Sequence, residues 1–266
     1  MEIAIIFLVV LGIIVLQGPV IRMYNLLYEK RQYKLFLAQE SIYHTIVSRD
    51  LKYYNRLTAA NQHKFLFRTY LFQKAKRFHY IEVEESAEMP ILISATAVQL
   101  TFGLEKYQFN FFREIYVVKH DYHYGFYSRP FEGHVDHSGI YLSWDKFIKD
   151  LRGLTPNCNM GLHEMGHALA YVNFISQTEE DKHFKKEWKN FSPVARPIFE
   201  SMRQGNRNLL DSYAGTNYQE FWAVSVEVFF ENPVRMRHDL PELYTAMCTL
   251  LRQDPIHLLS INKLAA

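Results

Sequence analysis

The stretch LHEMGHAL, residues 162 to 169, places two histidines four positions apart, with a glutamate directly after the first. On an α-helix this spacing brings both imidazoles to one face, one turn apart, so that two ring nitrogens can meet one metal ion. The glutamate of an HExxH pattern can then reach a water molecule on that ion. The pattern therefore favours a zinc site at His163 and His167, with Glu164 beside the water.

The surrounding residues strengthen this interpretation. Between Met160 and Phe174, only Tyr171 and Asn173 add polar side chains to the three of the motif. Burying three polar side chains without partners would cost several kcal/mol in total, and a bound cation would remove that cost. The alternative is a buried cluster in which the histidines and the glutamate hydrogen-bond to one another.

A two-histidine site needs a third ligand, usually a carboxylate from another element. The segment YAGTNYQEFWAVSVEVFFENP, residues 213 to 233, predicts a helix that begins after Thr216 or Asn217 and carries Glu220 and Glu227 on one stripe. Periodicity alone would assign this acidic stripe to solvent, and Glu220 could instead complete a capping box with Asn217. Spacing leaves Glu220 and Glu227 as equal candidates for the third ligand.

These two segments, together with PELYTAMCTLLRQDP at residues 241 to 255, resemble the Mlc titration factor A family of zinc-dependent peptidases. The similarity includes ILISATAVQLTFGL and GIYLSWDKF, and so covers roughly residues 60 to 256. The spacing of seven residues between Tyr213 and Glu220 also resembles the protease domain of lethal factor. The resemblance implies a zincin-like fold, zinc bound by His163, His167 and Glu220, Glu164 as the general base, and Tyr213 poised over the site.

The resemblance leaves Glu227 as a candidate to contact a ligand rather than the metal itself. Two features depart from the family. Ala170 stands where the family tends to carry an aspartate, three residues after the second histidine, and an apolar N-terminal segment precedes the region of similarity. Zinc binding remains the expectation, whereas substrate range and location do not follow from the family.

The rest of the sequence predicts an α+β domain over residues 25 to 266, helix-rich with a small sheet, whose N-terminal part is helical. With 266 residues and 48% hydrophobic side chains, the chain can form a sizeable core. The predicted elements are a helical stretch to about residue 76, strands at 77–83, 114–119 and 139–144, a buried helix at 91–104, and helices at 160–175, 184–203, 217–231 and 241–253.

The N-terminus predicts a membrane anchor over residues 1–24. Residues 3 to 21 contain no charged side chain, and about 20 apolar residues suffice to cross a bilayer as a helix. A cleaved signal peptide is the alternative, but no basic residue precedes the apolar run and no small-x-small cleavage site follows it. Because Arg22, Lys30, Arg31 and Lys34 follow the segment, we expect a single-pass protein with a cytoplasmic catalytic domain.

Composition excludes several other classes. The net charge of +2 gives no reason to expect a nucleic-acid partner. Two cysteines without a CxxC spacing indicate neither a disulfide framework nor a cysteine zinc site. The histidine-rich loop at residues 120 to 137 has no specific ligand spacing, so a polar surface loop is favoured over a second metal site.

We therefore predict a membrane-anchored zinc metallopeptidase that acts on a peptide or protein substrate. A zinc-activated water deprotonated by Glu164 would hydrolyse the peptide bond, and zinc and Tyr213 would stabilise the oxyanion. The alternative is a regulatory zinc-binding protein that sequesters a transcriptional regulator or another protein partner. An intramembrane protease is disfavoured, because the motif helix is too short to span a bilayer.

The predicted topology can be tested with reporters fused to the C-terminus. A cytoplasmic catalytic domain should give green fluorescence from a fluorescent-protein fusion and little activity from an alkaline phosphatase fusion, because the basic residues after the segment favour retention inside. Phosphatase activity without fluorescence would place the domain outside and contradict the assignment.

Overall fold

The structure is a computed structural model that describes residues 23, 26–123, 125, 130–155, 158–176 and 180–261. The chain divides into two units, Met1–Ile42 and Tyr43–Ala266, and residues 26–37 of the first unit are helical. The predicted membrane anchor lies outside the described residues, apart from Met23. Within the described part of the chain, no helix has the length and apolar character needed to cross a membrane.

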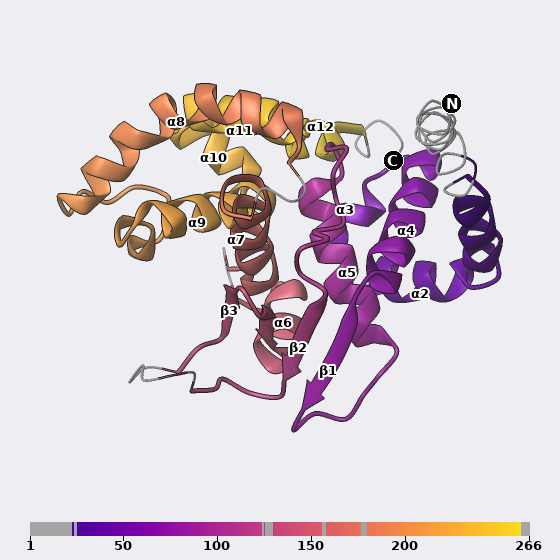
Figure 1. The fold of residues 1–266 in the computed structure, drawn as a ribbon. Helices are drawn as coiled ribbons and strands as arrows, with labels where there is room; N and C mark the ends of the chain where they lie inside the picture. The colour runs from indigo at the N-terminus through magenta and orange to yellow at the C-terminus, as the bar shows by residue number, and fades with distance from the viewer. Residues whose placement is uncertain are drawn as a thin grey trace, which may run out of the picture. The chain divides into compact units, whose positions relative to one another are not determined.

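The second unit contains a four-stranded sheet in the order β1-β2-β4-β3 (Figure 1). Strands β1 (Arg77–Ile81), β2 (Glu114–Val118) and β4 (Gly139–Ser143) are parallel, and they confirm the three predicted strands. The edge strand β3 (Gly133–Asp136) runs antiparallel to β4 inside the stretch expected to be an irregular loop. A strand of four residues, GHVD, is too short and too polar to give a clear alternating pattern.

Helices make up most of the second unit. The predicted helices at 91–104, 160–175, 184–203, 217–231 and 241–253 are all present, with shifted ends, whereas α6, α10 and α12 were not predicted. The helical elements of the structure are α2 (Glu40–Asp50), α3 (Lys52–Asn55), α4 (Ala59–Lys74), α5 (Glu88–Thr101), α6 (Trp144–Leu151), α7 (Met160–Phe174), α8 (Lys182–Arg203), the 3₁₀ turn η1 (Ser212–Gly215), α9 (Tyr218–Glu231), α10 (Pro233–Asp239), α11 (Pro241–Leu251) and α12 (Pro255–Ile261).

Helix α7 lies at the centre of this arrangement, between the sheet and α9 (Figure 1). It packs against α5, α6 and α9, and it also contacts the edge strand β3. Its N-cap is Asn159, whose side-chain oxygen accepts a hydrogen bond from the backbone amide of Leu162 at 3.0 Å. The helix with the HExxH motif therefore packs against other helices and against the sheet.

One face of the sheet carries a row of stacked rings. His79, Tyr116, Tyr141 and His134 stand opposite one another on the four strands, with ring centroids 4.8, 4.3 and 4.2 Å apart in that order. Stacked cross-strand pairs of this kind stabilise neighbouring strands. The row therefore holds the short edge strand β3 in register with β4.

The end of α5 meets the end of α11 in a close joint. Gln253 donates from Nε2 to the carbonyl oxygens of Gln99 at 3.1 Å and Leu100 at 2.9 Å. A Cβ atom at Gly103 would overlap the carbonyl oxygens of Leu251 and Arg252, which belong to the backbone and cannot move aside easily. Glycine is therefore required at position 103.

Replacing this glycine tests the joint. We expect Gly103→Ala to lower the free energy of unfolding by about 1–3 kcal/mol, as overpacking does. Gly166→Ala is the matched control, because its Cβ would lie at an ordinary 3.5 Å from Ala223 Cα and alanine favours helix by up to about 1 kcal/mol. Urea denaturation of both variants measures the difference, and equal midpoints would show that the joint is looser than described.

Candidate metal centre

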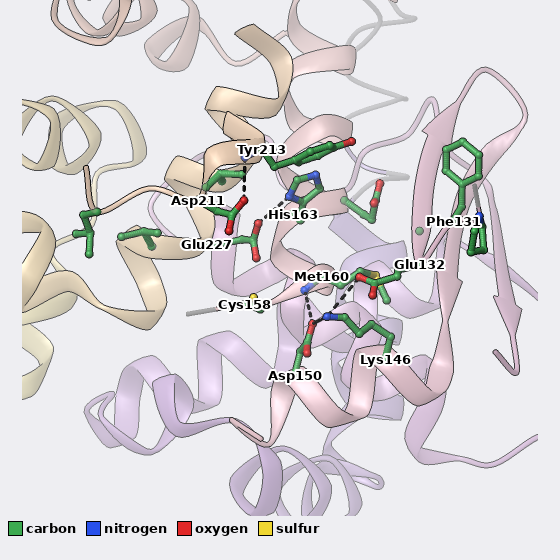
Figure 2. A pocket seen from close by; sticks show the side chains of 16 residues that line it. Phe131, Glu132, Lys146, Asp150, Cys158, Met160, His163, Asp211, Tyr213 and Glu227 are labelled. Atoms are coloured by element: carbon green, nitrogen blue, oxygen red, sulfur yellow. Dashed lines mark hydrogen bonds and ion pairs between the residues drawn. The ribbon is translucent and has the colours of Figure 1, made fainter. Parts of the chain in front are cut away.

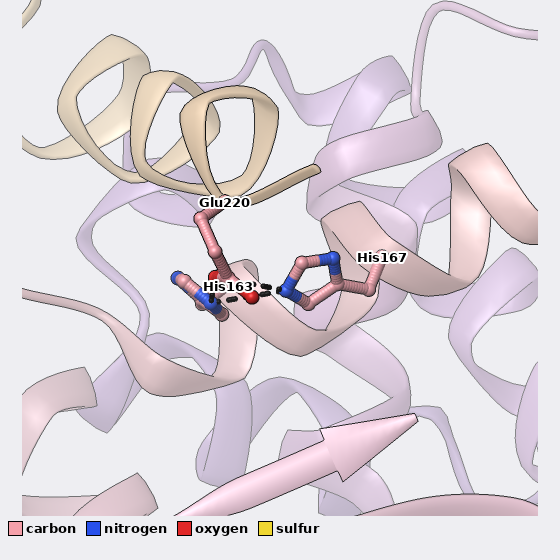
Figure 3. Close-up of side chains that lie close together, drawn as sticks. All are labelled: His163, His167 and Glu220. Atoms are coloured by element: carbon pink, nitrogen blue, oxygen red, sulfur yellow. Dashed lines mark hydrogen bonds and ion pairs between the residues drawn. The ribbon is translucent and has the colours of Figure 1, made fainter. Parts of the chain in front are cut away.

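Three side chains from two helices converge on one point (Figure 3). His163 and His167 lie one turn apart on α7, and Glu220 lies in the first turn of α9. The two Nε2 atoms are 3.1 Å apart, and Oε2 of Glu220 lies 3.0 Å from Nε2 of His163 and 3.3 Å from that of His167. The ligand atoms of a tetrahedral zinc site, with bonds near 2.0–2.1 Å, are separated by about 3.3 Å. The residues therefore fit a zinc ion.

Glu227 contacts a histidine rather than the convergence point. Its Oε1 lies 2.7 Å from Nδ1 of His163, and its Oε2 accepts a hydrogen bond from the backbone amide of Asn159 at 2.8 Å. A carboxylate at Nδ1 selects the tautomer with the proton there, which leaves the lone pair on Nε2 directed at the metal position. Glu227 thus contacts only His163 of the two histidines, whereas Glu220 reaches both.

The charges around the convergence point favour a cation. Burial raises the pKa of Glu220, but hydrogen bonds to His163 and His167 outweigh burial and lower the pKa to about 2. Burial lowers the pKa of His163, but the carboxylates of Glu220 and Glu227 outweigh it and raise the pKa to about 10. In the metal-free chain His163 therefore holds a proton, which supplies positive charge in place of an ion. This proton must be released when a metal binds.

Glu164 lies between the candidate centre and the edge strand β3, and it lines the same cavity as His163. It is buried, with 5% of its surface exposed, and its Oε2 has no hydrogen-bond partner among the described residues. Burial raises the pKa of this carboxyl. A Cβ atom on Gly133 of β3 would lie 2.8 Å from Cγ and Oε1 of Glu164, so only glycine at this position leaves room for the glutamate.

Tyr213 lies on the turn η1, at the open side of the site. Its backbone amide donates to Oδ1 of Asp211 at 2.8 Å, and its ring centroid lies 6.3 Å from that of His163. Burial raises the pKa of the phenol, so the hydroxyl stays protonated at neutral pH and can donate a hydrogen bond. The residue expected over the site is therefore close to it, with half of its surface exposed.

The structure also decides between two roles proposed for the start of α9. Asn217 is the N-cap, because its side-chain oxygen accepts hydrogen bonds from the amides of Gln219 at 2.9 Å and Glu220 at 3.0 Å. The side chain of Glu220 turns to the two histidines. The acidic stripe of α9 therefore faces α7 at Glu220 and Glu227, and solvent is not its environment there.

The histidine-rich loop makes other contacts. His120 pairs with Asp145 at 2.7 Å, and His134 belongs to the stacked row on the sheet. Within the described ranges, His163, His167 and Glu220 form the only trio with ligand atoms close enough to share an ion. Nδ1 of His167 has no hydrogen-bond partner among the same residues. Ala170, three residues further along α7, has no polar side-chain group that could serve as one.

A cavity of about 840 Å³ extends from the candidate centre beneath Tyr213 (Figure 2). His163 and Tyr213 lie at one end, and Lys146 and Asp150 of α6 lie at the other. Glu164 also lines the cavity. Sequence analysis did not identify the residues of α6, although Lys146 lies within GIYLSWDKF, a segment that carries the family resemblance. Helical pattern alone does not tell which distant residues share a cavity.

Comparison with known proteins agrees with this centre. The sequence model of a family described as glucose-regulated metallo-peptidase M90 matches residues 28–252. A curated relative is the uncharacterized protein slr2042 of Synechocystis sp. (strain ATCC 27184 / PCC 6803 / Kazusa), which is 23% identical over 121 residues. That alignment covers 44% of this chain and 44% of the relative, so the chain matches less than half of the length of that protein.

Substituting the two carboxylates separates their roles. Glu220→Ala should lower zinc content sharply because it removes a ligand, whereas Glu227→Ala should lower zinc affinity by about 10–100-fold because it removes the partner of a ligand. Glu242→Ala, an exposed carboxylate on α11, is the control. Zinc per chain is measured by mass spectrometry after dialysis, and equal zinc in Glu220→Ala and the parent would refute the ligand assignment.

Proposed function

The chain belongs to the glucose-regulated metallo-peptidase M90 family, which is the Mlc titration factor A family that its sequence resembles, and we propose that it is a zinc-dependent peptidase. The observation that carries the proposal is the convergence of His163, His167 and Glu220 at 3.0–3.3 Å beside the buried, unpartnered carboxyl of Glu164. A purely structural zinc site does not require a buried carboxyl group beside a cavity, so Glu164 favours a catalytic site.

Glu164 is the proposed general base. A bound zinc ion would supply Lewis-acid polarisation of the scissile carbonyl and would lower the pKa of a nearby water. The Glu164 carboxylate accepts the proton of the attacking water at the cavity wall and then donates it to the leaving amine. Burial favours the protonated form of the group, so that it can return the proton after receiving it.

Tyr213 is the proposed donor to the oxyanion. Its phenol is protonated at neutral pH and it lies at the open side of the centre, where the substrate enters. A hydroxyl that donates to the oxygen on which charge develops stabilises the transition state more than the substrate. Asp211 fixes the start of η1 and so fixes the position of this ring.

The position of the edge strand β3 favours a polypeptide as the substrate. It forms the border of the sheet, and residues 130 to 133, which lead into it, line the cavity beside Glu164. An extended peptide can pair with an exposed strand edge through its main chain, which fixes the peptide without reading its sequence.

We further propose that residues 1–24 anchor the protein in a membrane, with the catalytic domain in the cytoplasm.

Two conservative substitutions test the mechanism. Glu164→Gln should retain zinc but abolish measurable peptide hydrolysis, because an amide cannot accept the proton. Tyr213→Phe should lower turnover on the order of 10²-fold with zinc content unchanged, because it removes one donor to the oxyanion. Hydrolysis of a fluorogenic peptide library by the full-length protein is measured beside zinc content on the same samples.

The two outcomes that contradict the proposal differ. Undiminished hydrolysis by zinc-loaded Glu164→Gln would remove the proposed base. A zinc-loaded parent that cleaves no peptide would instead favour the regulatory alternative, in which the site binds a protein partner and leaves it intact.

A further inference from the structure

The cavity beside the candidate centre has a charged far end. Lys146 lies there with its Nζ 3.2 Å from Oδ2 of Asp150 and 3.3 Å from Oε2 of Glu132 (Figure 2). Two carboxylates therefore already neutralise the single lysine of the cavity. An anionic ligand would have to displace one of them, which makes Lys146 a poor anchor for negative charge.

Apart from Lys146 and His163, the charged side chains of the lining are carboxylates, namely Glu132, Asp150, Glu164, Asp211 and Glu227. Asp211 and Glu227 point into the cavity between Tyr213 and the far end, as Figure 2 shows. Burial is the main cause of the raised pKa of the Cys158 thiol, and Glu227, Asp150 and Asp211 raise it further, while Lys146 lowers it. At the sulfur, the carboxylates therefore outweigh the lysine.

One carboxylate oxygen at the far end lacks a donor. The Asp150 side chain is fully buried, and its Oδ2 accepts hydrogen bonds from the Met160 amide at 3.1 Å and from Lys146. Its Oδ1 has no hydrogen-bond partner among the described residues. A buried carboxylate oxygen without a donor is costly, and a cationic N–H group that enters the cavity would remove that cost directly or by recruiting Lys146 to it.

The walls between the two ends are apolar. They could cover the methylene groups of a long side chain while its charged head reaches the acidic residues. These walls come from α7, from α9 and from the segment before η1, and they include Met160, Leu209, Val224 and Val228.

We propose that this cavity is a specificity pocket for the side chain of a lysine or arginine adjacent to the scissile bond of the substrate. The inference rests on the proposed peptidase function, since it assigns a substrate class to that same site. A volume of about 840 Å³ exceeds what the amino group of a substrate N-terminus needs, and this favours a side chain as the occupant.

Binding without turnover tests the pocket independently of catalysis. The full-length Glu164→Gln variant, loaded with zinc, is titrated calorimetrically with blocked alanine peptides that carry lysine, norleucine or glutamate at each position in turn. At one position, lysine should bind about tenfold more tightly than norleucine, because one charge-assisted hydrogen bond is added, and glutamate should bind most weakly.

A variant that removes one charge tests which residue causes the preference for lysine. Glu132→Gln, introduced in the Glu164→Gln background, removes an exposed carboxylate of the cavity and keeps the side-chain shape. The lysine advantage should fall at least threefold, while norleucine binding stays within twofold, because only exposed charge is lost. Glu242→Gln is the matched control, and zinc content and thermal melting show that each variant is folded.

The outcomes separate this inference from the proposed function. Equal binding of lysine and norleucine peptides at every position would overturn the proposal of a pocket for basic side chains. A preference for glutamate would overturn it as well. Tight binding of unblocked alanine peptides with no gain from lysine assigns the cavity to a free N-terminus and also overturns it. A lysine preference in binding together with no cleavage by the parent would support the pocket and reject the peptidase.

Discussion

The buried carboxylate of Glu227 is the interaction on which the centre depends. One oxygen holds Nδ1 of His163 at 2.7 Å, and the other accepts the backbone amide of Asn159, the N-cap of the same helix. A single side chain from α9 therefore fixes both the start of α7 and the orientation of its first histidine. With α9 held in this way, Glu220 in its first turn comes within reach of both histidines, although Glu227 itself contacts only one of them.

The position of Glu164 on α7 depends on the sheet. Glu164 can stand beside β3 because Gly133 has no side chain, and β3 stays in place because His134 stacks on Tyr141 in the row of rings. The histidines and the glutamate of one short motif therefore rely on two separate supports. The convergence of the candidate metal ligands depends on packing between two helices, while the position of the proposed base depends on a strand of only four residues.

The sequence predicted the elements that carry strong local patterns, including α7, α9 and three of the four strands. It could not choose between Glu220 and Glu227 from spacing, because a helical stripe shows which residues share a face and not what that face meets. The acidic stripe faces His163 and Asn159 rather than water. Strand β3 and the cavity residues of α6 were missed for the same reason, since their roles arise only from contacts between distant segments.

Helix α9 makes one further contact with α7, through the indole of Trp222. Trp222 is buried and donates from Nε1 to the carbonyl oxygen of Gly166 at 2.8 Å, in the turn between the two histidines. Its ring also lies 5.1 Å from that of Trp188. Indole emission depends on the local electric field and on neighbouring rings, so a shift of α7 against α9 changes the light that the protein emits. The molecule thus carries an intrinsic fluorescent probe at the carbonyl of Gly166, between its two candidate histidine ligands.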